Sequence, residues 1–148
     1  MVWSGVTYRF VTLAPHKFFG HTRAWVGDQA VEIATREKTI IDGLDHPEWC
    51  GGIIQLARGL WRGRSEIDLT QVCRDARRMK NGAIFKRLGY LLERLNLGSE
   101  ELRDRLAKDV SEGYSLLDPL SPHAGKHLAR WHLVVNVADD DLLGWRET

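Results

Sequence analysis

The chain has 148 residues, of which 43% are apolar and 28% are charged, as in an ordinary globular domain. No apolar run approaches the roughly 18 residues of a membrane-spanning helix, and no repeat or low-complexity tract is present. The net charge of +1 is unevenly spread: residues 58–94 carry ten Lys or Arg against four Asp or Glu, and residues 95–148 carry six against ten. A basic middle indicates a partner bound there, either nucleic acid or an acidic protein, although ordinary solvated helix faces would give the same counts.

The cysteines and the N-terminus favour a cytoplasmic location. The first ten residues lack the basic segment and apolar core of a signal peptide. Cys50 and Cys73 lie far apart and form no Cys-x-x-Cys pair, which is typical of reduced thiols in the cytoplasm.

Strands are predicted in the first quarter of the chain. Alternating β-forming residues predict a strand over Val6–Leu13, which ends before Pro15. Arg23–Val26 and Ala30–Ala34 flank a Gly-Asp-Gln turn, so they predict a short hairpin.

Helices are predicted through the middle of the chain, and most of them begin at a capping residue. The expected caps are Thr35, Asp68, Asn81 and Ser99. The expected helices end near Leu44, Trp61, Met79, Leu95 and Val110. In the helix after Asn81, apolar residues recur at the spacing of one buried face: Ile84, Leu88, Leu91, Leu92 and Leu95.

The remaining segment completes the fold prediction. Ser115–Gly125 contains two prolines and predicts a loop, and Trp131–Val137 predicts a final strand that returns to the sheet. Strands that are segregated from a helical block indicate an α+β fold. We therefore expect one domain over residues 1–148, with a small mixed or antiparallel sheet of three to four strands from both chain ends, covered by four to five central helices.

Four phrases of the sequence resemble the effector domain of AbiE-type antitoxins. They are a Phe-Phe-Gly turn, a strand that runs into a helix with a Gly-Gly break, a capped amphipathic helix with a basic shoulder, and a final apolar strand: Phe18–Gly20, Val31–Gly52, Asn81–Glu93 and Trp131–Asn136. That family consists of bacterial regulators from phage abortive-infection and type IV toxin–antitoxin operons. The resemblance covers nearly all of Tyr8–Asn136 and depends on the order and spacing of the phrases.

The resemblance implies an antitoxin effector domain that neutralises a nucleotidyltransferase-like toxin, without enzymatic activity or a cofactor of its own. Complete family members carry a winged-helix DNA-binding head, which acts as the transcriptional regulator of the operon. This chain begins where that head would end, so we expect no sequence-specific repression from it. Neutralisation by direct contact and neutralisation through a shared target both remain open.

A cluster of basic residues is the predicted partner-binding surface. Its members are expected on the solvent-facing sides of two consecutive helices: Arg74, Arg77, Arg78, Lys80, Lys86 and Arg87. Guanidinium groups at this density suit carboxylate or phosphate recognition, so a toxin protein and a nucleic acid are both candidate partners. A solvated face that is partly neutralised by Asp75 and Glu93 is the alternative interpretation.

A metal-dependent nucleotidyltransferase is the competing interpretation. In that class of enzyme, Gly51-Gly52 would lie beside a triphosphate, and Glu66 and Asp68 would hold divalent cations from a strand. The run from Glu66 to Leu69 is short and polar for a central strand, so we favour Asp68 as a helix cap. A third interpretation is a nucleic-acid-binding accessory domain that uses the same basic face.

The histidines and tryptophans are the remaining candidates for a metal site and for core or partner contacts. His123 and His127 have the spacing of metal ligands on a helix, but a neighbouring proline and glycine predict a loop, so we expect no metal site. The tryptophans within predicted elements are expected in the core or at its edge: Trp25, Trp61 and Trp131. A tryptophan near a chain end could instead anchor a partner, because Trp carries a large share of interface energy.

Overall fold

Helices dominate the computed structural model, which describes residues 1–147. The longest helices run through the middle of the chain: α1 (Arg36–Asp45), α2 (Ile53–Arg62), α3 (Leu69–Arg78), α4 (Gly82–Leu95) and α5 (Glu100–Lys108). Shorter helical segments lie at breaks and near the C-terminus: η1 (Pro15–Lys17), η2 (Pro47–Trp49), α6 (Asp139–Leu143) and η3 (Gly144–Glu147). Within residues 1–147, no helix combines the length and apolar character needed to cross a bilayer.

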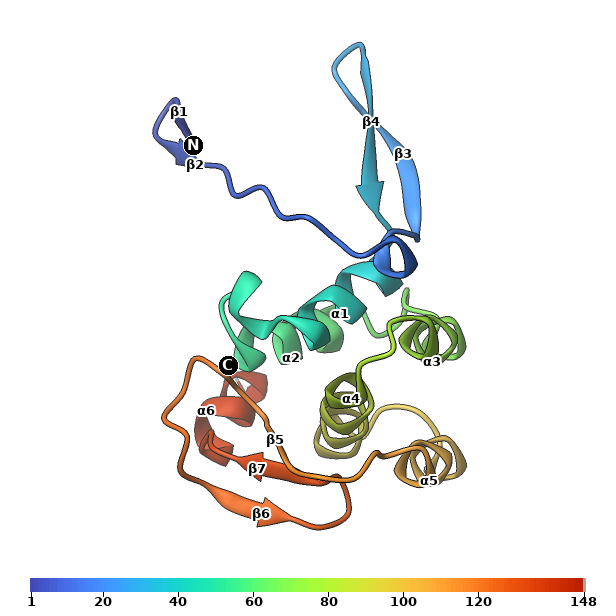
Figure 1. Ribbon diagram of the computed structural model, residues 1–148, viewed down its shortest axis with the longest axis vertical. Helices are drawn as coiled ribbons and strands as arrows, with labels where there is room; N and C mark the ends of the chain where they lie inside the picture. The colour runs from blue at the N-terminus through green and yellow to red at the C-terminus, as the bar shows by residue number, and fades with distance from the viewer. Residues whose placement is uncertain (148) are drawn as a thin grey trace.

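The strands of the described part of the chain form three separate small sheets (Figure 1). Two are antiparallel hairpins, and the third places its last strand in the middle: β1 (Val2–Trp3) with β2 (Val6–Thr7), β3 (His21–Val26) with β4 (Gln29–Ala34), and β5 (Ser115–Leu116), β7 (Leu133–Val135) and β6 (Lys126–Leu128). In this third sheet β7 pairs parallel with β5 and antiparallel with β6. The predicted α+β class with small mixed or antiparallel sheets is confirmed, and the strands of the two chain ends lie in different sheets.

The predicted helix starts are confirmed at each expected cap. Every cap side chain accepts a hydrogen bond from a backbone N–H of the first helical turn: Thr35, Asp68, Asn81 and Ser99. These bonds satisfy donors that the first turn of a helix leaves free, so they fix where each helix begins. At its other end α4 stops at Asn96, whose φ of 52° is left-handed.

The apolar face of α4 is the centre of the core. Its predicted stripe is fully buried: Ile84, Leu88, Leu91, Leu92 and Leu95. The fully buried Trp131 packs over the same helix at Gly89, where a Cβ would come within 1.9 Å of the indole Cζ3 atom. The indole N–H donates to Glu93 Oε2 over 3.2 Å, so the one polar atom of the buried ring is satisfied.

A buried guanidinium on α4 joins three elements of the fold. Arg87 is only 7% exposed, and its Nη1 donates to the carbonyl oxygen of Leu44 at the end of α1 over 2.7 Å. Its Nε and Nη2 atoms donate to the carbonyl oxygen of Leu116 on β5, over 3.1 and 3.0 Å. Arg87 therefore braces α1, α4 and the C-terminal sheet, and the prediction of an exposed position for it is wrong.

The C-terminal segment also supplies the cap of α2. Asp118 Oδ2 accepts from the backbone N–H of Ile53 over 3.2 Å, because the residue before the helix, Gly52, has no side chain to do so. Asn136 holds Asp118 in place, since its Oδ1 accepts from the Asp118 N–H over 3.0 Å and its Nδ2 donates to the Asp118 carbonyl over 2.7 Å. Residues more than sixty positions apart thus fix the start of α2.

The N-terminal part of the chain projects from the helical body (Figure 1). The first arm contains the β1–β2 hairpin followed by Tyr8–Ala14, which has no regular structure, although the sequence predicts a strand over Val6–Leu13. The second projection is the β3–β4 hairpin, which confirms the predicted hairpin and extends it by two residues at its start. Trp25 on this hairpin is 68% exposed, so the prediction that it lies in or beside the core is wrong.

A pair of glycine substitutions tests the packing of α4. We expect Gly89→Ala to lower the free energy of unfolding by about 2–3 kcal/mol, because the added methyl group overlaps the buried Trp131 ring. Gly59→Ala on α2 is the matched control: its Cβ would meet no atom within 4 Å, so the change should raise stability by about 0.5–1 kcal/mol. Urea denaturation followed by circular dichroism measures both, and equal effects would contradict this packing.

Removing the buried guanidinium should cost more than removing an exposed one. We expect Arg87→Met to lower the free energy of unfolding by about 3 kcal/mol, because the carbonyls of Leu44 and Leu116 lose charged hydrogen-bond donors inside the protein. The exposed Arg62 on α2 supplies the control, Arg62→Met, which should change stability by less than about 0.5 kcal/mol. Similar losses in the two variants would show that Arg87 does not brace the fold.

Candidate functional site

Helix α3 presents basic side chains because its other face is built for the core. The buried positions recur at helical spacing: Val72, Cys73 and Ala76, with Met79 just beyond the helix. Arg74, Arg77 and Arg78 therefore face outward and are exposed. Arg77 and Arg78 also lie in the last turn of α3, where positive charge complements the helix dipole.

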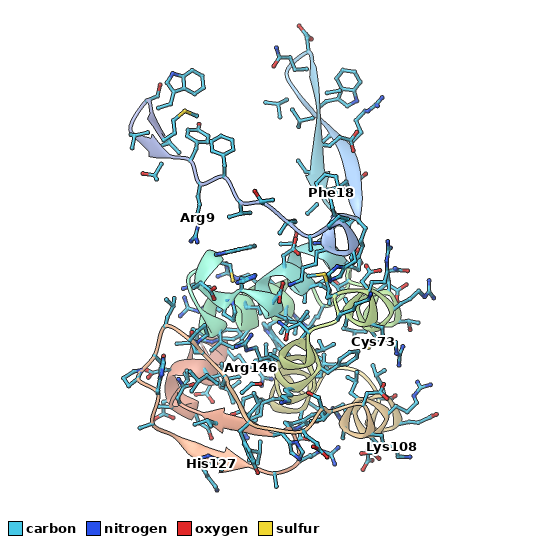
Figure 2. The ribbon with its side chains drawn as sticks, viewed as in Figure 1. Arg9, Phe18, Cys73, Lys108, His127 and Arg146 are labelled. Atoms are coloured by element: carbon cyan, nitrogen blue, oxygen red, sulfur yellow. The ribbon has the colours of Figure 1, made fainter. Side chains whose placement is uncertain are left out.

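A groove of about 160 Å³ separates α3 from α5. Its lining combines arginine, hydroxyl, thiol and leucine side chains: Thr70, Cys73, Arg74, Arg77, Leu102, Arg105 and Leu106. Figure 2 labels Cys73 on α3 and Lys108 on α5, the two helices that border the groove. We call this set of residues the arginine groove. It places three guanidinium groups, from Arg74, Arg77 and Arg105, around an apolar floor.

Most of the positive charge of the arginine groove is not neutralised by the protein. Within residues 1–147, neither Arg74 nor Arg105 forms a salt bridge, and Arg74 Nη1 donates to the neutral Gln71 Oε1 over 2.9 Å. Arg77 Nη2 lies 3.1 Å from Asp109 Oδ2, but both side chains are largely exposed, at 61% and 44%. An ion pair in water is weak, so this one can be exchanged for a partner's carboxylate or phosphate.

The thiol at the floor of the arginine groove is poorly suited to nucleophilic chemistry. Burial raises the pKa of Cys73, and this effect outweighs the opposing influence of Arg77 and Arg105. The side chain is 6% exposed and lies among the core residues of α3. Because the thiolate is the reactive form, a raised pKa keeps Cys73 in its unreactive neutral form at physiological pH.

The other predicted site residues on this part of the chain lie outside the arginine groove. The Arg78 guanidinium stacks over the Phe19 ring, 3.8 Å from its centroid, and so joins α3 to the base of the β3–β4 hairpin. Lys80 is exposed in the turn between α3 and α4, where its φ of 53° is left-handed. Of the six predicted residues, Arg74 and Arg77 lie together in the groove, and Arg78 and Lys80 extend the basic surface along the chain.

Lys86 and Arg87 are not part of any exposed surface. Lys86 is 3% exposed, and its Nζ donates to the Gly113 carbonyl oxygen over 2.7 Å and lies 3.3 Å from Ser115 Oγ. Burial lowers the pKa of Lys86 and also that of Arg87. The prediction that Lys86 and Arg87 belong to an exposed binding surface is wrong, because residues 112–116 cover the polar face of α4 opposite the leucine stripe.

The carboxylates of the nucleotidyltransferase interpretation have structural contacts. Glu66 lies in a turn rather than on a strand, and its Oε2 is 2.7 Å from Arg36 Nη2. Asp68 Oδ1 accepts from the backbone N–H groups of Thr70 and Gln71, which is the cap expected for α3. The alternating strand that would present both carboxylates to one cation is absent from the described residues.

Other candidate metal ligands are dispersed. Within residues 1–147, no group of three or more His, Cys, Asp or Glu side chains is arranged to hold a metal ion. His127 lies on β6 and packs edge-on against Tyr114, with ring centroids 4.9 Å apart, and His123 lies in the preceding bend.

Arg105 is the groove residue that the sequence analysis missed. It lies on α5, a helix that begins with two glutamates and belongs to the acidic part of the chain. A local signal was present, because Arg105 directly precedes Leu106 on the apolar stripe of α5 and therefore borders the buried face. Its approach to Arg74 and Arg77 depends on how α5 packs beside α3, which no local pattern encodes.

Comparison with protein-family models, curated proteins and solved structures finds no match for this chain. What the arginine groove can bind is therefore inferred from its own residues. Guanidinium groups recognise carboxylates and phosphates through paired hydrogen bonds, and the leucines of α5 add apolar contact area. The groove is suited to an acidic segment that also carries apolar side chains.

The two thiols should differ in reactivity. We expect a disulfide reagent at pH 8 to modify the exposed Cys50 in the folded protein and to modify Cys73 only after unfolding, since burial raises the pKa of both thiols but blocks access to Cys73 alone. Counting released thiol chromophore with and without urea measures this difference, and the Cys50→Ser and Cys73→Ser variants assign each phase. Fast modification of Cys73 in the folded chain would show that the groove floor is open.

Proposed function

We propose that this chain is a non-enzymatic antitoxin effector domain of a bacterial abortive-infection system, acting in the cytoplasm on a nucleotidyltransferase-like toxin. The proposal rests on the resemblance of the ordered phrases to AbiE-type antitoxins and on the arginine groove. In complete members of that family, a DNA-binding head fused to such a domain regulates the operon. In our proposal, the domain neutralises the toxin by binding it directly.

The observation that supports this proposal is the set of three exposed arginines that line the arginine groove, of which, within residues 1–147, only Arg77 forms a salt bridge, with the exposed Asp109. Arg74, Arg77 and Arg105 come from two helices and converge on one hollow. A protein partner that inserts Asp or Glu side chains there would gain charge-assisted hydrogen bonds, and it would cover Leu102 and Leu106 at the same time.

The two other functions receive less support. A nucleic acid could bind the same arginines through its phosphates, but the described groove residues include no aromatic ring on which a base could stack. A nucleotidyltransferase would need Glu66 and Asp68 to hold metal ions together, whereas the first pairs with Arg36 and the second caps α3. Binding to a toxin therefore remains the proposal.

A growth-rescue assay tests this function. The chain is co-expressed with the toxin encoded beside its gene, and we expect rescue by the wild type and loss of rescue by the Arg74→Glu plus Arg105→Glu variant. The control with the same change in charge is Arg62→Glu plus Arg64→Glu, at exposed positions on and just after α2. This control should still rescue growth, because those arginines lie outside the arginine groove.

A second pair of substitutions separates the enzyme from the antitoxin. Glu66→Gln plus Asp68→Asn removes both carboxylate charges, and asparagine still caps a helix, so α3 should stay intact. Rescue by this variant supports a binding role, and loss of rescue in a folded protein supports the metal-dependent enzyme. Tight binding to duplex DNA or RNA that falls steeply with added salt, together with no binding to the toxin, would support a nucleic-acid partner instead.

A further inference from the structure

The two N-terminal projections expose an unusual amount of apolar surface. Seven apolar side chains of the first arm are at least 40% exposed: Met1, Val2, Trp3, Val6, Tyr8, Phe10 and Val11. On the β3–β4 hairpin, the exposed ones are Trp25, Val26, Val31 and Ile33. Both projections leave the same end of the helical body (Figure 1), so these side chains belong to one region of the molecule.

The β3–β4 hairpin has an apolar face with nothing packed on it. Its register pairs Ala24 with Val31 and Thr22 with Ile33, so these residues share one face. The opposite face carries the pair of Arg23 and Glu32, whose Nε and Oε1 atoms are 3.5 Å apart, and also the exposed Trp25, which pairs with Ala30. A sheet normally buries an apolar face, and an isolated two-stranded sheet is only marginally stable in water.

The first arm contains a strand sequence without a partner strand. Residues 8–13 alternate and are rich in β-forming residues, and Tyr8 forms backbone hydrogen bonds with Met1, but among the described residues Arg9–Leu13 pair with no strand. In Figure 1 this part of the chain is drawn out from the body to the small β1–β2 hairpin. The unpaired segment Arg9–Leu13 is nearly as long as each hairpin strand, which has six residues.

We propose that the N-terminal arm is a strand-exchange device through which two copies of this chain form a dimer. Residues 9–13 of one copy add to an outer edge of the partner's β3–β4 hairpin, and the partner's arm does the same in return. Each hairpin becomes a three-stranded sheet, and the exposed aromatic and aliphatic side chains of arm and hairpin pack against one another. The contact is two-fold symmetric, so it closes as a dimer.

Area and charge both favour a second copy as the occupant. At about 150–250 Å² for a fully buried aromatic side chain, the exposed apolar side chains of the two projections amount to roughly 1,000 Å². A stable interface buries about 800 Å² per partner, and monomers seldom expose a patch of more than about 600 Å². Arg9 is the one charged side chain in residues 1–14, and the hairpin carries Asp28 and Glu32 against Arg23, so arm and hairpin are complementary in charge.

Sedimentation velocity of the full chain over a wide range of concentration tests this proposal. We expect a dimer for the wild type, and for Phe10→Pro plus Val31→Lys a folded monomer whose dissociation constant is raised on the order of 30-fold or more. Proline removes a strand hydrogen bond, and lysine places a charge on the apolar face. Leu120→Ser, at a 59% exposed apolar residue outside both projections, should remain dimeric.

A mixing experiment shows whether the arm binds the other copy. Chains with Phe10→Cys are mixed with chains with Ile33→Cys, all in a Cys50→Ser background, and are treated with a short thiol crosslinker. We expect crosslinked pairs that contain one chain of each kind. The proposal is overturned by a wild type that is monomeric at every concentration, by a dimer that the double variant leaves intact, or by a mixture that yields no crosslinked pair containing one chain of each kind.

Discussion

The fold depends on one buried guanidinium, that of Arg87. A helix leaves its last carbonyl groups without partners, and α1 ends inside the protein, where water cannot supply them. Arg87 donates to the Leu44 carbonyl there and, from the same planar group, to the Leu116 carbonyl on β5. Since a guanidinium keeps its charge and its fixed fork of donors, it sets both the spacing and the orientation of the two carbonyls. The relative placement of α1, α4 and the C-terminal sheet follows from this geometry.

This brace also determines which basic residues remain available on the surface. Arg87 and Lys86 use the polar face of α4 to hold the end of α1 and the chain between residues 112 and 116. α5 follows α4 after the left-handed turn at Asn96 and packs against it, close enough to α3 for the two helices to share the arginine groove. The basic residues in the middle of the chain thus have two roles. Lys86 and Arg87 are buried and hold the fold together, whereas the arginines of the arginine groove stay exposed to a partner.

Local chemistry explains why the helices could be predicted. Caps such as Asp68 and Asn81, and the leucine stripe of α4, act within one or two turns of the chain. The sheets could not be predicted equally well, because β5 and β7 are set by contacts over long sequence distances. In the candidate site, the clustering of basic residues in the sequence was enough to predict Arg74 and Arg77. The burial of Lys86 could not be predicted, because it depends on a loop, distant in sequence, that covers α4. The strand predicted over Val6–Leu13 forms only at Val6–Thr7, and within residues 1–147 its remainder pairs with no strand, which is why we propose that a second copy supplies the partner.

Hydrogen–deuterium exchange of the chain, alone and with the toxin encoded beside its gene, tests the central claim most directly. If the arginine groove binds the toxin, slowed exchange should appear in residues 70–78 of α3 and 100–108 of α5, and the N-terminal arm should exchange as it does in the chain alone. Protection confined to other segments would contradict the account, and so would the absence of any change at toxin concentrations that suffice for growth rescue.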